Sequence, residues 1–284
     1  MSDSPYSDLQ QKKYIVSVSG GLTSIEAWRR CLEKHGKENT VPVFADVGTV
    51  IENGRVVSGE DEDLFRFLSD AEHYLGQKCH RIQHPKYKCI WDAFFGERYV
   101  TNGRIDTCSK FLKREVLRKF FEQFTDAVWV VGFSWVEIDR MEDFRKHQPK
   151  VWFPLAETPI VTSKSLADWW REKGIEPPRM YTLGFSHNNC GGLCYKAGLG
   201  QAYDVWRLTP WRYEYNERMQ EKFLAEISPH GTFLRRKKKN ISLKQLREEF
   251  ESGYVPGTSN YESCGGKCMI PDESETIFLD PIFQ

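Results

Sequence analysis

The sequence predicts an α/β fold in which a mainly parallel, Rossmann-like sheet is flanked by helices and followed by a loop-rich, helical part that contains cysteines. Short β-branched and apolar runs alternate with amphipathic helical patterns along the first half of the chain. A pair of glycines directly follows the first of these runs. After about residue 149, Trp, Pro and Gly become frequent, and the pattern changes to loops with short helices.

The first half reads as strands and helices in turn. The expected strands cover residues 14–18, 41–45, 79–82 and 127–132, and the last is apolar enough to be fully buried. The expected helices cover residues 24–35, 61–75 and 109–124. In such sheets ligands bind at the carboxyl ends of the strands. We therefore expect a site where residues 19–24, Asp46 and residues 132–140 meet.

The second half is expected to contain helices at residues 163–173, 203–227 and 242–252. We divide the chain into an α/β core over residues 1–150 and a C-terminal part over residues 151–284 that packs on this core. The one charge run, residues 235–239, is basic. Such a run can contact a nucleic-acid backbone, or it can be a solvated loop.

Length and composition exclude several classes of protein. The 284 residues suffice for one large α/β domain with an appendage, or for two small domains. Basic and acidic residues balance at 40 each, which argues against a strongly basic nucleic-acid binder. No run of about 18 apolar residues exists that could cross a membrane. The polar, acidic N-terminus does not resemble a signal peptide, so we expect a cytoplasmic protein.

The glycine pair is the strongest candidate site. Residues 19–24 read Ser-Gly-Gly-Leu-Thr-Ser between the first strand and the first helix. Glycines let backbone N–H groups approach an anion closely, and a helix N-terminus adds about half a positive charge. Ser19 and Ser24 can donate hydroxyls, and Ser24 can cap the helix. No lysine follows the glycines, so this is not a P-loop. The alternative is a glycine turn with a serine cap.

Polar groups near the other strand ends can complete an anion site. Asp46 can hold a ribose hydroxyl or Mg²⁺, or it can make an ordinary strand-end turn. Lys113 and Arg140 can clamp phosphate or sulfate oxygens, or they can be solvated helix charges. Glu137 can orient Arg140, which lies three residues later, or it can coordinate a metal.

The eight cysteines indicate metal or redox chemistry rather than disulfides if the compartment is reducing. We expect Cys31, Cys79 and Cys89 to be structural. Cys108 lies at the start of an expected helix, where the helix dipole lowers the pKa of a thiol. The remaining four lie in two segments of the form Cys-Gly-Gly-x-Cys, at Cys190 with Cys194 and at Cys264 with Cys268. His187, just before the first segment, can act as a ligand, donate a hydrogen bond to a sulfur, or cap the loop.

Taken in order, these segments resemble the PP-loop of the adenine nucleotide α-hydrolase superfamily and the phosphoadenosine phosphosulfate (PAPS) reductase branch of that superfamily. Residues 43–49 resemble the Asp-Thr-Gly segment of the family. Residues 108–117 resemble its Cys-x-x-x-Lys-x-x-Pro-Leu helix, with Glu115-Val116 in place of Pro. Residues 132–140 resemble Gly-x-Arg-x-x-Glu-Ser-x-x-Arg, with Ser134 in place of the first Arg. Residues 152–155, Pro177, Tyr181 and a Gly-Cys segment resemble the remainder.

The resemblance implies an adenine nucleotide, either ATP or PAPS or its relative without the 3′-phosphate (APS), together with Mg²⁺. It assigns catalysis to Lys113, Glu137 and Arg140. Family members that cleave ATP often carry Asp where this chain has a threonine. The implied nucleotide-binding residues are Ser17, Ser19, Gly20, Gly21, Leu22, Thr23, Ser24, Asp46 and Gly132.

The resemblance also implies a metal site. Iron–sulfur members of the reductase branch take ligands from a cysteine pair before the Lys-containing helix and from a later Cys-x-x-Cys. Cys108, Cys190 and Cys194 match three of these positions, and Ser109 stands at the fourth. The missing ligand would come from Cys264 or Cys268. Four cysteines fit a [4Fe-4S] cluster or structural Zn²⁺, and free thiols in glycine turns are the alternative.

Three functions follow as hypotheses. The first is a PP-loop enzyme that cleaves ATP between the α- and β-phosphates, adenylates an acceptor (a nucleic acid or a small molecule) and passes sulfur or another nucleophile to the activated atom. The second is reduction of PAPS or APS with Cys264 as nucleophile. The third is a non-catalytic nucleotide- or nucleic-acid-binding component of an assembly. An oligomer is compatible with all three.

Overall fold

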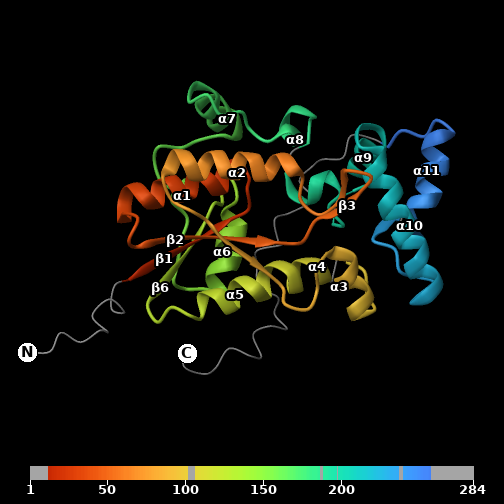
Figure 1. Ribbon diagram of the computed structural model, residues 1–284, viewed down its shortest axis with the longest axis horizontal. Coiled ribbons are helices and arrows are strands. Elements are labelled where there is room, and N and C mark those ends of the chain that lie inside the picture. Colours follow the sequence, from red (N-terminus) through yellow and green to blue (C-terminus); the bar gives the residue numbers. More distant parts are fainter. Residues whose placement is uncertain (1–11, 102–105, 186–187, 197, 237–238, 257–284) are drawn as a thin grey trace, which may run out of the picture.

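The computed structural model describes residues 12–101, 106–185, 188–196, 198–236 and 239–256. Its main sheet has five strands in the order β5-β2-β1-β6-β7, and all four strand pairs are parallel. This confirms the α/β fold with a Rossmann-like sheet flanked by helices (Figure 1). The strands are β1 (Lys13–Val18), β2 (Thr40–Asp46), β5 (His80–Gln83), β6 (Ala127–Val131) and β7 (Val151–Trp152).

Alternate side chains of the strands supply two hydrophobic clusters, one on each face of the sheet. On one face, Val16 and Val130 pack with α1 (Leu22–His35), α2 (Glu62–Leu75) and α7 (Ser163–Glu172). On the other face, Ile15 and Trp129 pack with α5 (Val116–Phe121) and α6 (Ile138–His147). Figure 1 shows α1 and α2 on the opposite side of the strands from α5. The central strands β1, β2 and β6 are therefore covered on both sides, as the alternating pattern predicts.

A third hydrophobic cluster lies at one end of the sheet, where Figure 1 shows α9, α10, α11 and β3. Trp91, Tyr213 and Phe223 are among its buried residues. The helices here are α3 (Ile90–Glu97), α9 (Leu199–Leu208), α10 (Pro210–Glu226) and α11 (Leu243–Glu251). The hairpin of β3 (Val50–Glu52) and β4 (Arg55–Ser58) covers them, and its turn residues Asn53 and Gly54 both have positive φ. Asn-Gly is the strongest short hairpin signal in a sequence, and our sequence analysis missed it.

Two predicted helices are interrupted. The helix expected at residues 203–227 is two helices, α9 and α10, because Pro210 cannot donate the hydrogen bond needed to continue α9 and instead starts α10. The helix expected at residues 109–124 is three segments: α4 (Thr107–Ser109), the π-helix η2 (Lys110–Glu115) and α5. Single π turns inside α-helices often occur at functional sites, and this one carries Lys113.

The segment after residue 150 begins within the main sheet. Its first strand, β7, pairs with β6, and Leu155, Leu166 and Trp170 join the cluster around α1 and α2. The boundary at residue 150 stays a prediction. Three residues of the basic run, Arg235, Arg236 and Lys239, lie in the antiparallel strands β8 (Leu234–Arg236) and β9 (Lys239–Ile241), and residues 237 and 238 lie outside the described ranges. Within the described ranges, no helix has the length and apolar character needed to span a membrane.

Candidate functional site

The glycine loop leads from the central strand β1 into α1. The chain continues from β1 to β2 on one side and later adds β6 on the other, so the order reverses at the end of β1. Crevices at such reversals are the usual ligand sites of open parallel sheets. Gly20 has a φ of +76°, in the left-handed region that glycine adopts without strain. The sequence prediction therefore places this loop correctly at a carboxyl edge of the sheet.

Ser24 closes the glycine loop. Its Oγ accepts hydrogen bonds from the Ser19 N–H at 3.0 Å and the Ser19 hydroxyl at 3.1 Å, and it donates to the Gly21 carbonyl at 2.9 Å. The prediction that Ser24 caps the helix is wrong, because α1 begins two residues earlier, at Leu22, with Gly21 as its N-cap. The hydroxyl instead fixes the loop backbone from inside the first turn.

Two glycines let neighbouring elements approach this loop. A Cβ on Gly132 would lie 2.7 Å from the Thr23 carbonyl oxygen and 2.8 Å from the Ser24 Cα. The end of β6 can therefore lie against the start of α1 because residue 132 has a hydrogen atom in place of a side chain. A Cβ on Gly20 would lie 2.6 Å from the Leu64 side chain, which brings the first turn of α2 against the loop. The end of β6 and the start of α2 therefore form walls of the loop.

Ser17 and Asp46, two of the residues that the resemblance implies for nucleotide binding, accept hydrogen bonds from other groups of the protein. The Ser17 hydroxyl is buried in the sheet and accepts a hydrogen bond from the Trp129 indole at 2.5 Å. One carboxylate oxygen of Asp46 accepts from the Gly48 N–H at 2.9 Å, which is the strand-end turn considered as the alternative for this residue. A ligand role for either residue stays a prediction.

Lys113 and the segment of residues 189–194, which we call the cysteine loop, both contact the buried carboxylate of Glu60. The Lys113 Nζ lies 3.1 Å from Glu60 Oε1, and the Cys190 N–H donates to Glu60 Oε2 at 2.7 Å. The Glu60 side chain is 1% exposed and the Lys113 side chain 16% exposed. Lys113 is thus not a solvated helix charge. It is an ammonium group held beside the cysteine loop by a carboxylate that the sequence analysis did not identify.

Glu137 and Arg140 lie beyond β6 as expected, and their side chains form an ion pair. Glu137 also accepts hydrogen bonds from the Ser134 N–H at 2.7 Å and the Ser134 hydroxyl at 2.9 Å. The Arg140 guanidinium stacks over the Phe133 ring, 4.1 Å from its centroid. Ser134, which stands where the family has an arginine, therefore positions Glu137, and Glu137 in turn orients Arg140.

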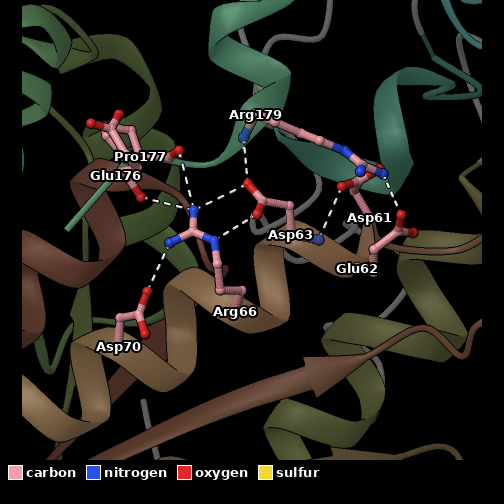
Figure 2. Close-up of polar contacts among 8 residues, drawn as sticks. All are labelled: Asp61, Glu62, Asp63, Arg66, Asp70, Glu176, Pro177 and Arg179. Atoms are coloured by element: carbon pink, nitrogen blue, oxygen red, sulfur yellow. Dashed lines mark hydrogen bonds and ion pairs between the residues drawn. The ribbon is translucent and has the colours of Figure 1, made fainter.

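The acidic segment of residues 60–63 joins this site to the C-terminal half. Asp61 caps α2 by accepting from the Asp63 N–H at 3.0 Å, and it pairs with Arg212 at 3.1 Å and with Arg179 at 2.9 Å. The Asp61 and Arg212 side chains are 1% and 2% exposed. Figure 2 shows Arg179 reaching both Asp61 and Glu62. A run of four acidic residues at a helix start was the available signal for this role.

The cysteine loop includes the short helix η4 (Asn189–Gly192), in which Cys190 itself has a φ of +50°. A Cβ on Gly191 would lie 2.0 Å from an Arg212 nitrogen, and one on Gly192 would lie 2.8 Å from Met180. Both glycines are therefore explained by close packing against other elements. Burial, followed by the Glu60 carboxylate, raises the pKa of the Cys190 thiol well above its usual value, while Lys113 opposes this. Such a thiol is a poor nucleophile at neutral pH.

Three of the predicted thiol ligands lie in one region. Cys108 and Cys194 are both close enough to Cys190 to raise the pKa of its thiol. The Cys108 thiol contacts the buried Thr101 hydroxyl at 3.2 Å. Within the part of the chain that the structure describes, no three His, Cys, Asp or Glu side chains form a group that could hold a metal. Cys264, Cys268 and His187 lie outside the described residues, so the metal site stays a prediction.

The other described cysteines have structural positions, as expected. Cys31 is fully buried and contacts the Thr40 hydroxyl at 3.4 Å, and burial raises the pKa of its thiol to about 11. Burial also raises the pKa of Cys79 to about 12. Cys89 is the N-cap of α3 and accepts from the Asp92 N–H at 3.5 Å. All six described cysteines are free thiols.

No protein-family model matches the sequence. A search of the curated proteins likewise finds no match.

Proposed function

We propose that this chain is a PP-loop enzyme that binds ATP or a related adenine nucleotide at the glycine loop and cleaves it between the α- and β-phosphates. The observation that carries the proposal is the glycine loop itself, at the strand-order reversal and packed against the bare backbone of Gly132. Helix N-termini in this position present N–H groups and positive potential to an anion. The ordered resemblance to the adenine nucleotide α-hydrolases supports the same ligand.

The reaction we propose is adenylation of an acceptor. A nucleophilic atom of the acceptor, a nucleic acid or a small molecule, attacks the α-phosphorus, and the bond from that phosphorus to the bridging oxygen breaks. The adenylated acceptor and pyrophosphate are the products. Mg²⁺, with Asp46 as its candidate ligand, and the cations Lys113 and Arg140 would offset the charge on the departing pyrophosphate. Glu60 and Glu137 hold these two cations in place before the nucleotide binds.

The cysteine loop supports sulfur-related chemistry as the second half of the proposal. Cys108, Cys190 and Cys194 supply soft thiol donors that suit a [4Fe-4S] cluster or Zn²⁺, with Cys264 or Cys268 completing the set. When bound, a cluster would supply a sulfur- or electron-carrying centre, and zinc would supply a structural crosslink. The free state of all six described cysteines agrees with the reducing cytoplasm that we propose as the compartment.

Product analysis tests the proposal. ATP labelled in the α-phosphate, incubated with the anaerobically purified protein and candidate acceptors, is expected to give AMP or an adenylated acceptor together with pyrophosphate. ADP and phosphate as products would contradict it. Sulfite from PAPS or APS would instead establish the reductase alternative. Tight ATP binding without turnover of either nucleotide would establish the non-catalytic alternative.

Metal and acid-labile sulfide analysis tests the thiol centre. About four irons and four sulfides per chain are expected for one such cluster. The same preparation of a Cys190→Ser, Cys194→Ser variant should lose them, while Cys31→Ser, which changes a core thiol, should retain them. One zinc without sulfide would favour a structural site. A protein with neither would remove the metal from the proposal and leave nucleotide cleavage standing.

A further inference from the structure

The helix α8 (Arg179–Thr182) brings a tyrosine to the glycine loop. The Tyr181 hydroxyl oxygen lies 3.1 Å from the position that a Cβ on Gly21 would occupy. Burial raises the pKa of this hydroxyl, although the backbone N–H of Leu22, the first residue of α1, is close enough to the oxygen to lower that pKa. With a raised pKa, the hydroxyl keeps its proton at neutral pH. The phenol is therefore a hydrogen-bond donor over the backbone that we propose for phosphate binding.

The segment that carries Tyr181, residues 176–185, is held firmly on α2, and we call it the strap. The Arg179 N–H donates to Asp63 at 2.7 Å, and the Arg179 guanidinium reaches Glu62 at 2.6 Å. Arg66 donates to the Glu176 carbonyl at 2.8 Å while it also binds Asp63. Figure 2 shows these contacts joining residues 176–179 of the strap to the N-terminal part of α2.

Hydrophobic contacts fix the strap from the other side. Met180 is fully buried and Phe185 is 3% exposed, both in the cluster that includes α9 and α10. Tyr181 packs instead against the cluster around α1 and α2. Because neighbouring residues enter two different clusters, the backbone of α8 is fixed on both sides, and the phenol packs with the cluster around α1 and α2. An anion that binds at the start of α1 would bind near the Tyr181 hydroxyl.

We infer that Tyr181 is a phosphate-positioning residue: its hydroxyl accepts the Leu22 N–H and donates its own proton to an oxygen of a phosphate bound at the glycine loop. The inference rests on the proposed nucleotide function and adds a donor from outside the loop. A hydroxyl that accepts one hydrogen bond becomes a stronger donor in the next, and donation to a charged acceptor is stronger than donation to a neutral one. The strap thus takes part in the nucleotide site.

The test compares Tyr181→Phe with the wild type by titration calorimetry, using ATP and inorganic pyrophosphate as probes. Loss of one hydrogen bond to a charged group is expected to weaken both by about tenfold or more. Adenosine, measured as a competitor of a fluorescent ATP analogue, is expected to bind as before, because it has no phosphate. Tyr74→Phe is the matched control, since the Tyr74 side chain is 43% exposed on α2 and should leave all three affinities unchanged.

The outcomes separate this inference from the function on which it rests. If the wild type binds ATP and Tyr181→Phe binds it equally or more tightly, the inference is overturned and the proposed function stands. Equal weakening of adenosine and ATP would also overturn it, because a structural defect affects every ligand. A wild type that binds neither ATP nor pyrophosphate overturns both proposals.

Discussion

The glycine loop and the cysteine loop differ in the sequence separation of the residues that their hydrogen bonds and ion pairs join. The polar contacts of Ser24 in the glycine loop join residues three and five positions apart. In the cysteine loop, Cys190 is bound by Glu60, 130 residues away, and the Arg212 that packs on Gly191 pairs with Asp61, 151 residues away. The hydrogen bonds of Ser24 hold one loop within its own sequence, and the other loop is held by side chains from distant parts of the chain.

The comparison shows that the cysteine loop needs buried charged residues and that the hydrogen bonds of the glycine loop do not. The glycine loop follows from a strand, two small residues and a helix start. In the cysteine loop, Cys190 has a positive φ and Gly191 lies against the buried Arg212 guanidinium. Glu60 accepts the Cys190 N–H, and Asp61 pairs with Arg212. We therefore expect substitutions in the acidic segment to affect global stability, and substitutions around the glycine loop to affect ligand binding more.

The largest expected effect is that of Asp61→Asn. Asparagine keeps the helix cap, because it is as good an N-cap as aspartate, but it leaves the Arg212 charge buried without its carboxylate. Breaking a buried ion pair by removing one partner costs about 3–5 kcal/mol. Urea unfolding of the variant and the wild type measures the difference.

The control for this substitution is Glu52→Gln, which breaks the ion pair with Arg218. These side chains are 40% and 58% exposed, so a loss below about 1 kcal/mol is expected. If both variants lost the same small amount, the buried pair would not be what holds the cysteine loop.

Gly132→Ala is expected to act on both stability and binding. The added Cβ would meet backbone atoms of Thr23 and Ser24 that cannot rotate away, which costs about 1–3 kcal/mol. The shift also moves the N–H groups at the start of α1, and ATP binding should weaken by about tenfold, the equivalent of one hydrogen bond to a charged group. Urea unfolding and ATP titration measure the two effects.

Gly174→Ala is the control for Gly132→Ala, because it adds backbone strain without a close contact to another part of the chain. Gly174 has a φ of +75° with nothing within 4 Å of its added Cβ, so alanine costs roughly 1–2 kcal/mol of backbone strain alone. Its ATP affinity should equal that of the wild type. An unchanged affinity in Gly132→Ala would show that the close approach of β6 does not shape the ligand site.

Arg179→Met tests the strap with a smaller effect. The Arg179 side chain is 44% exposed, so its ion pairs should contribute less than about 1 kcal/mol to global stability. Locally, the backbone amides of residues 179–185 should exchange faster with deuterium, because the guanidinium contacts to α2 are lost. Exchange equal to that of the wild type would mean that the remaining contacts of the strap hold it without the Arg179 guanidinium.

The smallest expected effect is a pH dependence at His35, far along α1 from the glycine loop. Burial, with help from Lys34, lowers the pKa of His35, whose ring stacks on Tyr14 at 3.5 Å. The unfolded chain then binds the proton more tightly than the folded one. This stability is complete above the unfolded pKa of about 6.5 and is lost as the pH falls below it. His35→Phe keeps a stacked ring and should unfold with less dependence on pH between 7.5 and 5.5 (roughly one unit on either side of that pKa). Identical pH profiles would contradict the assignment.

Most elements of the sheet were predictable because a strand or helix that faces a core repeats its apolar residues at a fixed period. The strand at Ala127–Val131 and the helix at Glu62–Leu75 were both predicted within one residue at their starts. The break at Pro210 and the π-helix around Lys113 were missed, because the apolar pattern continues through both. Periodicity reports which face is buried, and it does not report how the backbone hydrogen bonds are made along that face.

By itself, the sequence determined the parallel sheet, the glycine loop at its carboxyl edge and the pair Glu137–Arg140. The sheet follows from strand and helix patterns that alternate along the chain, and the loop and the ion pair each join residues close together in the sequence. Only the tertiary structure decided that Glu60 joins Lys113 to Cys190, that Arg212 pairs with Asp61 and that Tyr181 lies at Gly21. These contacts bring together segments more than 50 residues apart, as the 53 positions between Lys113 and Glu60 illustrate. Their partners are fixed by the packing of whole elements, and the local sequence carries no periodic signal for them.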